Sequence, residues 1–349
     1  MPSIAIVGAG PRGISLVERL AAHLRATPLA SELTLHIIDD APLGAGRIWD
    51  TEQTRTLCMN TLAGAVTLFT EPGSTTTAPV VEGPILYEWI QLLRGERPDL
   101  SPAKLKLYDA FPPREDLATS FAEELEQTRP ESNPSRALYG AYLEWVYEVA
   151  LRQLPENVEV VQHRARAVSI DAGDNQDTIA LSDDSTITAD ATVLAYGWQV
   201  PALNESERLL ADAAESGLHW VRPDNPVEQP VTDVPAGEKM LVRGLGMGFF
   251  DIMALLTIDR GGQFVEDPST RSGLRYEPSG DEPHFIVSSG RGYPYIPKSE
   301  YHALPPKAAL VRFRRAVTEV GDELDFSTQL LPHILRDAYA EYLSLIHIS

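Results

Sequence analysis

Residues 3–39 contain a strand–turn–helix–strand pattern that restricts the fold more than any other part of the sequence. The apolar run SIAIV at residues 3–7 is typical of a buried parallel strand, and residues 14–24 carry apolar side chains at helical spacing. A second apolar run, LTLHII at residues 33–38, ends at Asp39. We therefore predict a β-α-β unit within an α/β, Rossmann-like domain built on a parallel sheet.

The turn after the first strand reads GAGPRG, which is the spacing of a dinucleotide-binding turn. Gly8 permits the tight bend, Gly10 lets the backbone approach a pyrophosphate, and Gly13 allows the helix to pack closely on the strand. The helix N-terminus favours phosphate charge, and an acid at the end of the next strand can accept hydrogen bonds from ribose hydroxyls. The alternative is a purely structural turn. The predicted contacts here are Gly8, Ala9, Gly10, Pro11, Arg12, Gly13 and Asp39.

A second strand–glycine–helix pattern begins at residue 240 and reads MLVRGLGMGFF. Its glycines are Gly244, Gly246 and Gly248, and Phe249 occupies the place of the third glycine of the usual motif. This pattern predicts a nicotinamide-dinucleotide site, and the alternative is a degenerate turn without a ligand. The expected strand after the helix lies at residues 263–265.

The choice between NADH and NADPH stays open at this second turn. Glu266 and Asp267 would accept hydrogen bonds from a free 2′-hydroxyl, whereas Arg271 would attract a 2′-phosphate. Arg291 and Lys298 could face the nicotinamide phosphates, although solvated loop charges are the alternative for both.

Composition excludes several classes of function. The formal net charge of -21 argues against non-specific binding to nucleic acid, which needs a basic surface. Cys58 is the only cysteine, so an intrachain disulfide and a cysteine-rich metal site are impossible, and the histidines show no metal-ligand spacing. No apolar run approaches the roughly 20 residues that span a bilayer. We expect a cytoplasmic protein with a small-molecule substrate and no metal, nucleic-acid or membrane partner.

The rest of the chain divides into segments of recognisable type. Residues 41–83 and 273–298 are loop-rich, and residues 201–235 contain many breakers and mark a domain crossing. We predict an FAD-binding domain at 1–200, an NAD(P)-binding-like domain at 201–300 and a helical segment at 301–342. Residues 343–348 read as a translated sequencing adapter, so we expect a truncated gene with an artefactual tail at 343–349. Predicted helices lie at 85–93, 117–127 and 138–151, and predicted strands at 158–161, 167–170, 178–181, 186–188 and 191–195.

Four further stretches carry a family resemblance. They are PLGAGRIW at 42–49, LCMNTLAG at 57–64, SRALYG at 135–140 and DATVLAYG at 190–197. Together with the first glycine turn, they resemble the bacterial FAD-NAD(P)-binding family, which includes FAD-dependent urate-hydroxylase-type proteins. SRALYG also resembles a helix start of N-hydroxylating and Baeyer–Villiger-type monooxygenases. The resemblance is good over residues 3–200. It implies a Rossmann-like FAD-binding domain of the disulfide-reductase type with a parallel sheet, and a second, partial or degenerate Rossmann-like NAD(P) domain. The cofactors that it implies are FAD and NAD(P)H.

The same stretches supply the other expected cofactor contacts. An amide at Asn60 can bond the polar edge of a flavin, and Met59 can pack on its ring, although a loop that simply packs is the alternative. Arg47 would pair with pyrophosphate or a substrate anion, and an exposed loop arginine is the alternative. Arg136 would bind phosphate or cap a turn. The remaining predicted contacts are Gly46, Ala167, Ala195 and Gly197. No catalytic residue can be assigned from the sequence.

The resemblance implies an FAD-dependent oxidoreductase that uses NAD(P)H, and specifically a monooxygenase that hydroxylates a small organic substrate through a flavin hydroperoxide. A reductase or dehydrogenase without oxygen activation is the second reading, and a non-catalytic flavin-binding protein is the third. A disulfide reductase is excluded because Cys58 has no partner for a redox pair.

Overall fold

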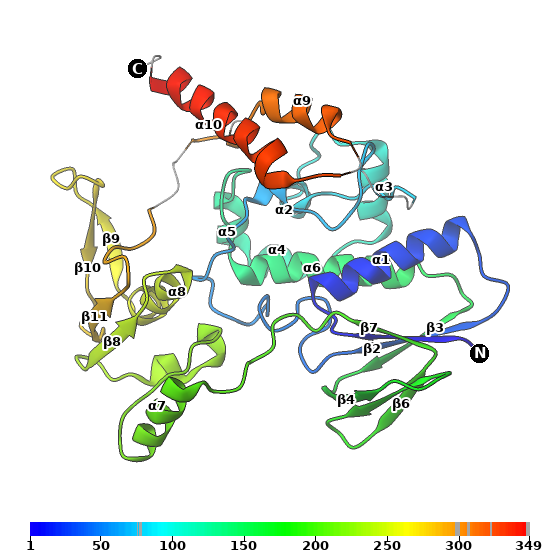
Figure 1. The fold of residues 1–349 in the computed structure, drawn as a ribbon, viewed down its shortest axis with the longest axis horizontal. Helices are drawn as coiled ribbons and strands as arrows, with labels where there is room; N and C mark the ends of the chain where they lie inside the picture. The colour runs from blue at the N-terminus through cyan, green and yellow to red at the C-terminus, as the bar shows by residue number, and fades with distance from the viewer. Residues whose placement is uncertain (75, 77–78, 297–300, 306–307, 322, 347–349) are drawn as a thin grey trace. The chain divides into compact units, whose positions relative to one another are not determined.

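A computed structural model of the chain describes residues 1–74, 76, 79–296, 301–305, 308–321 and 323–346. Internal contacts divide the chain into two units, Met1–Ser299 and Glu300–Ser349. Figure 1 shows the elements of both. Lys298 and the end of the suspected tail, residues 347–349, lie outside the described residues.

A four-stranded parallel sheet is the centre of the first unit (Figure 1). Its order is β3-β2-β1-β7, so the strand that carries the first glycine turn lies in the interior of the sheet. Ile6 of β1 is in register with Ile37 of β2 on one side and with Val193 of β7 on the other. The predicted β-α-β unit and the α/β fold are confirmed. The elements are β1 (Ser3–Val7), α1 (Pro11–Ala26), β2 (Leu33–Ile38), β3 (Val158–His163) and β7 (Ala191–Leu194).

The two faces of this sheet are covered by different layers. Alternation along β1 sends Ile4 and Ile6 toward a core shared with α1 and α6 (Arg136–Arg152), and Ala5 and Val7 toward the opposite face. A three-stranded antiparallel sheet packs on that opposite face, with Ile179 fully buried between the layers. Its strands are β4 (Ala167–Asp171), β5 (Asp177–Leu181) and β6 (Thr186–Ala189).

The long loop after β2 contains only one short helical turn among its described residues, Ala63–Ala65, and is held by side chains instead. Arg19 of α1 donates to the carbonyl oxygen of Pro79 (2.8 Å) and to Thr70 (3.2 Å), while it pairs with the buried carboxylate of Glu18. The predicted helix at 117–127 is interrupted at Phe121, and α3 was not predicted. The helices that follow the loop are α2 (Leu86–Leu93), α3 (Pro102–Ala110), α4 (Leu117–Ser120) and α5 (Ala122–Gln127).

The region of the second glycine turn differs from the prediction in its pairing. β9 lies antiparallel to β10 rather than beside β8, and the strand parallel to β8 is β11, where Ile286 pairs with Leu241. Both β10 and β11 fall in a stretch predicted as loop, and α7 falls in the predicted crossing, where Asn204 and Glu207 form a capping box. The elements are α7 (Glu205–Glu215), β8 (Lys239–Arg243), α8 (Met247–Leu256), β9 (Gln263–Glu266), β10 (Leu274–Glu277) and β11 (His284–Ser288).

The second unit consists of helices among its described residues. Asp337, on α10 (Leu331–Ile346), accepts hydrogen bonds from the backbone N–H of Phe313 (2.9 Å) and from the guanidinium of Arg312 (3.0 Å) at the start of α9 (Val311–Glu319). A π-helical turn, Phe326–Leu330, leads into α10. None of the described helices in either unit combines the length and apolarity needed to cross a membrane.

Candidate functional site

Two glycines of the first turn are required by packing against neighbouring backbone. Gly8 has a φ of +104°, and a Cβ there would lie 2.4 Å from the carbonyl oxygen of Ala195. A Cβ on Gly13 would lie 2.0 Å from the carbonyl oxygen of Gly8. No real Cβ contact is that short, so both positions exclude a side chain by steric overlap. The turn is further held by a hydrogen bond from the Gly8 N–H to Ile38 (2.8 Å).

Gly10 has different surroundings, because a Cβ there would meet no atom of the described residues within 4 Å. Gly10 is the N-cap of α1, where no side chain caps the helix, and Pro11 follows in the first helical turn. It borders a cavity of about 980 Å³, within the range of about 300–1,000 Å³ that is usual for ligand pockets. Open space before unpaired helix N–H groups fits the pyrophosphate of FAD.

Asp39 braces the glycine turn as well as bordering the cavity. One carboxylate oxygen accepts from the backbone N–H of Ala9 (2.7 Å), and the other accepts from the N–H of Ala41 (2.8 Å). A carboxylate has about four acceptor positions. Two therefore stay available for ribose hydroxyls, as the sequence predicts.

The cavity brings together predicted residues from four separate stretches of the chain. They come from the first turn, from the loop after β2 and from the ends of β4 and β7, which meet at one edge of the sheets. Ala9 and Gly13 belong to the turn but do not line the cavity. The predicted residues that line it are Gly8, Gly10, Pro11, Arg12, Asp39, Gly46, Arg47, Ala167, Ala195 and Gly197.

Sequence reasoning missed several lining side chains. Arg166 lines the cavity and forms an ion pair with Asp40 (2.7 Å), and Trp198 is an exposed aromatic residue on its wall. Arg47 donates to the carbonyl oxygen of Trp198 (3.1 Å) and pairs with Glu228 (3.2 Å). Position in the sequence could have indicated such residues. Asp40 and Trp198 come just after β2 and β7, and ligands of α/β sheets bind at the carboxyl ends of the strands.

Three predicted flavin contacts are not among the residues that line this cavity. Met59 is 4% exposed and packs in the core beside α6. Asn60, the next residue, is exposed. Arg136 begins α6, and its guanidinium bonds the carboxylate of Asp251 on α8 (2.7 Å). Their role at a flavin stays a prediction.

The second glycine turn has the local geometry of a dinucleotide turn. Gly244 has a φ of +118°, and Gly246 is the N-cap of α8. A Cβ on Gly246 would lie 3.5 Å from the ring of Tyr295, which is an ordinary contact. The guanidinium of Arg291 lies 4.4 Å from the centroid of the same ring. The structure thus places Arg291 near this turn, whereas Lys298 lies outside the described residues.

The residues expected to select NADH or NADPH lie in or next to the β9–β10 hairpin. Asp267 follows β9 and bonds Ser269 (2.5 Å) and Arg275 (3.2 Å). Glu266 ends β9 opposite Leu274, and Arg271 lies in the connection between the two strands. β9 pairs with β10 and not with β8, so these residues do not lie on a strand next to β8 in its sheet. The choice of nucleotide stays open.

Buried tyrosines stand behind the cavity wall. The Tyr139 ring meets Trp49, which lines the cavity, edge-on at 4.7 Å between centroids. Burial raises the pKa of Tyr139 to about 12 and raises the pKa of Tyr142 further. Both hydroxyls therefore stay protonated at neutral pH, and Tyr142 donates to the carbonyl oxygen of Pro84 (2.9 Å). These residues shape the wall.

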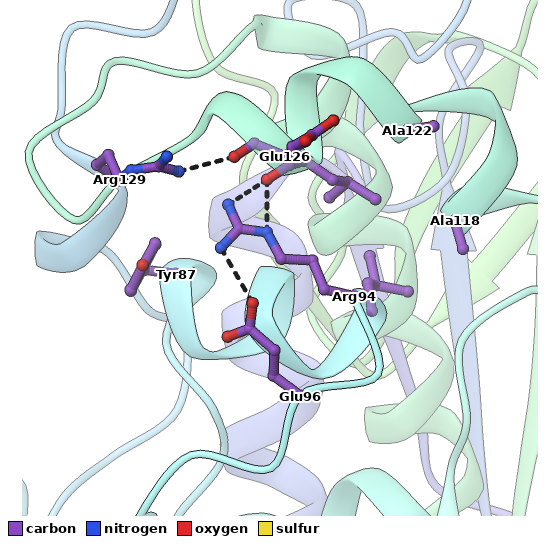
Figure 2. Close-up of a pocket in the computed structure, with 9 residues that line it drawn as sticks. Tyr87, Arg94, Glu96, Ala118, Ala122, Glu126 and Arg129 are labelled. Carbon is purple, nitrogen blue, oxygen red and sulfur yellow. Dashed lines mark hydrogen bonds and ion pairs between the residues drawn. The ribbon is translucent and has the colours of Figure 1, made fainter.

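A separate cavity of about 680 Å³ lies between α2 and α5 (Figure 2). Arg94 donates to the carbonyl oxygens of Leu125 (2.6 Å) and Thr128 (2.5 Å). Arg129 donates to the carbonyl oxygen of Glu126 (2.7 Å). Because both guanidinium groups are bonded to backbone at the end of α5, they hold that helix end.

Comparison with known proteins adds to this geometry. The sequence profile of the FAD-NAD(P)-binding family matches residues 5–199. A nitrosuccinic acid synthase of Aspergillus oryzae is 41% identical over 299 residues, which are 84% of this chain and 40% of that protein. L-Aspartate N-monooxygenases (nitrosuccinate-forming) of Streptomyces cremeus and Streptomyces davaonensis are 37% and 35% identical over 85% and 97% of this chain. The chain spans 43% and 52% of those two proteins, about half their length.

Proposed function

The chain belongs to the FAD-NAD(P)-binding family, and from that premise we propose that it is an FAD-dependent monooxygenase that uses NAD(P)H. The observation that carries the proposal is the open cradle at Gly10, which faces a cavity of about 980 Å³. When bound, FAD would supply the redox chemistry, namely hydride acceptance from the nicotinamide and activation of dioxygen.

The residues of this chain bind and orient the cofactors. Backbone N–H groups at the start of α1 hold the pyrophosphate, and Asp39 holds the adenosine ribose through its two remaining acceptor positions. The turn at Gly246, with Arg291 nearby, holds the nicotinamide dinucleotide. Met59 and Asn60 would contact the flavin ring and its polar edge, as the sequence predicts.

The names of three relatives suggest the substrate class. Each is named for nitrosuccinate formation, and two are named L-aspartate N-monooxygenases. We therefore assign this chain the N-hydroxylation of a small amino acid with an acidic side chain. This assignment is finer than the urate-hydroxylase-type resemblance, and it places the oxidation at an amine nitrogen instead of a ring carbon.

The test starts with the absorption spectrum of the purified chain and the mass of its released cofactor, with FAD as the expected result. L-Aspartate is then added with NADPH or NADH in air, and mass spectrometry follows N-oxidised product. Succinate, which lacks the amine, is the matched control and should give none. Absence of flavin after loading with FAD would refute the proposal. Flavin reduction by the nucleotide that yields neither peroxide nor N-oxidised product in air would instead support a reductase.

A further inference from the structure

The loop that carries Met59 and Asn60 is anchored in the core of the second glycine-turn region. Leu57 is 1% exposed although it lies in a loop. Its side chain packs with Val231, Leu255 and Leu256, all of them buried. Leu255 and Leu256 end α8, the helix that begins at the second glycine turn. A movement of α8 would therefore act directly on Leu57.

Polar contacts fix the same loop to the turn that follows α8. The hydroxyl of Thr54 donates to Asp259 (2.9 Å), and the hydroxyl of Thr56 donates to the same carboxylate. Asp259 lies in the short turn Ile258–Arg260. Residues 54–57 thus contact the C-terminal end of α8 through both apolar and polar side chains.

On its other side, the loop pairs with the start of α6. Cys58 forms an antiparallel bridge with Ser135, and the N–H of Met59 donates to the carbonyl oxygen of Pro134 (2.8 Å). The N–H of Arg136 donates to the carbonyl oxygen of Leu57 (2.8 Å). The loop and the start of α6 therefore form one hydrogen-bonded segment.

An ion pair connects the start of α6 directly to α8. Nη2 of Arg136 lies 2.7 Å from Oδ2 of Asp251, and the two side chains are only 17% and 19% exposed. Asp251 lies on α8, one turn after the N-cap Gly246. A pair so shielded from water depends strongly on both members, because removal of one leaves the other charge without compensation.

We propose that Arg136 and Asp251 are positioning residues that fix the second glycine turn relative to the loop of Met59 and Asn60. This inference rests on the proposed function, in which the nicotinamide must reach the flavin ring. Reacting atoms need to come within about 3–3.5 Å, and a displacement of about 1 Å can lower a rate about 100-fold. The ion pair sets that alignment through α8, and this role replaces the cofactor contact that the sequence predicts for Arg136.

The first test is Asp251→Asn, which keeps the size of the side chain and removes its charge. FAD content and the Kd for NADP⁺ should stay within about twofold of wild type, while stopped-flow flavin reduction by NADPH slows at least about tenfold. Asp109→Asn is the matched control, because it breaks an exposed ion pair with Arg97 (2.8 Å). Reduction at the wild-type rate in Asp251→Asn would overturn the inference.

A second readout needs no turnover, because Cys58 is the only cysteine and lies within the loop. Its rate of labelling by a thiol reagent is measured with and without NADP⁺. In wild type, NADP⁺ should slow labelling at least about twofold, and in Asp251→Asn that ratio should return to about one. Equal ratios in the two proteins would contradict coupling through this pair.

The two proposals fail separately. If neither NADPH nor NADH reduces the flavin of the wild-type protein, the proposed function is wrong. This experiment needs no variant. The inference can then still be tested without nucleotide. Amide hydrogen exchange at residues 54–60 should be at least about tenfold faster in Asp251→Asn than in Asp109→Asn. Exchange that is equal in these two variants would show that the pair does not hold the loop.

Discussion

Gly10 and Gly13 lie three positions apart in one turn, yet an added side chain would meet very different surroundings. At Gly13 the nearest atom to a new Cβ is a backbone carbonyl oxygen at 2.0 Å, whereas at Gly10 no described protein atom lies within 4 Å. Gly10 also has a φ of -75°, which any residue tolerates. Close packing therefore explains why a glycine is needed at Gly13, and the space that a ligand needs explains the glycine at Gly10.

This difference predicts opposite outcomes for two substitutions. Gly10→Val should unfold at the wild-type temperature in the FAD-free form but lose FAD binding, because its side chain fills the pyrophosphate approach. Gly13→Ala should lower the free energy of unfolding by about 1–3 kcal/mol through overpacking. Thermal unfolding of the FAD-free proteins and flavin absorbance after loading check both. A Gly10→Val protein with normal FAD content would refute the assignment of this turn.

At the scale of elements, neighbouring strands of the parallel sheet bring two histidines together. Nδ1 of His36 on β2 lies 3.0 Å from Nε2 of His163 on β3. Burial lowers the pKa of both imidazoles, and His36 lowers the pKa of His163 further. Glu159 and Asp183 act in the opposite direction, on His36 and His163 respectively. The folded state therefore binds protons at this pair less readily than the unfolded chain does.

The pair predicts a stability change with pH. Unfolded histidine titrates near pH 6.5, at about its ordinary pKa. Because the folded pKa values are lower, the unfolded state takes up protons first, so stability is kept above about pH 6.5 and falls as the pH drops toward the folded values. Urea unfolding between pH 8 and pH 5.5 measures this slope. His163→Gln should flatten it, and the exposed His219→Gln should not; an unchanged slope in His163→Gln would contradict the prediction.

At the scale of the whole molecule, the proposed function assigns FAD to the first glycine turn and the nicotinamide dinucleotide to the second. The first turn borders the large cavity, and the second begins α8, whose far end packs with Leu57. Under this proposal, different parts of the chain carry flavin binding and flavin reduction. The two processes should respond separately to substitution.

Gly246→Val tests that division. A Cβ at this position would meet only the Tyr295 ring, at 3.5 Å, among the described residues. The variant should therefore fold and keep its FAD, while flavin reduction by NAD(P)H slows at least tenfold, because the side chain occupies the approach of the second pyrophosphate. Stopped-flow reduction measures this, with Gly10→Val as the reciprocal variant. Unchanged reduction would remove the second site from the proposal.

Local patterns in the sequence were sufficient to predict the first β-α-β unit, because strand alternation and the steric rules of a glycine turn act over a few residues. They placed Gly8, Gly10, Gly13 and Asp39 correctly in the turn and at the strand end. The same rules missed β11, a short strand whose hydrogen-bond partner lies in β8, across an intervening helix and hairpin.

Long-range partners were decided only by the tertiary structure. Arg136 reads equally well from the sequence as a phosphate ligand or a cap, and the fold pairs it with Asp251, 115 residues away. Leu57 likewise reads as part of a loop and is buried among residues from the second half of the chain. No local periodicity encodes such a partner, because a charge or an apolar side chain is satisfied by whichever group the folded backbone brings within reach.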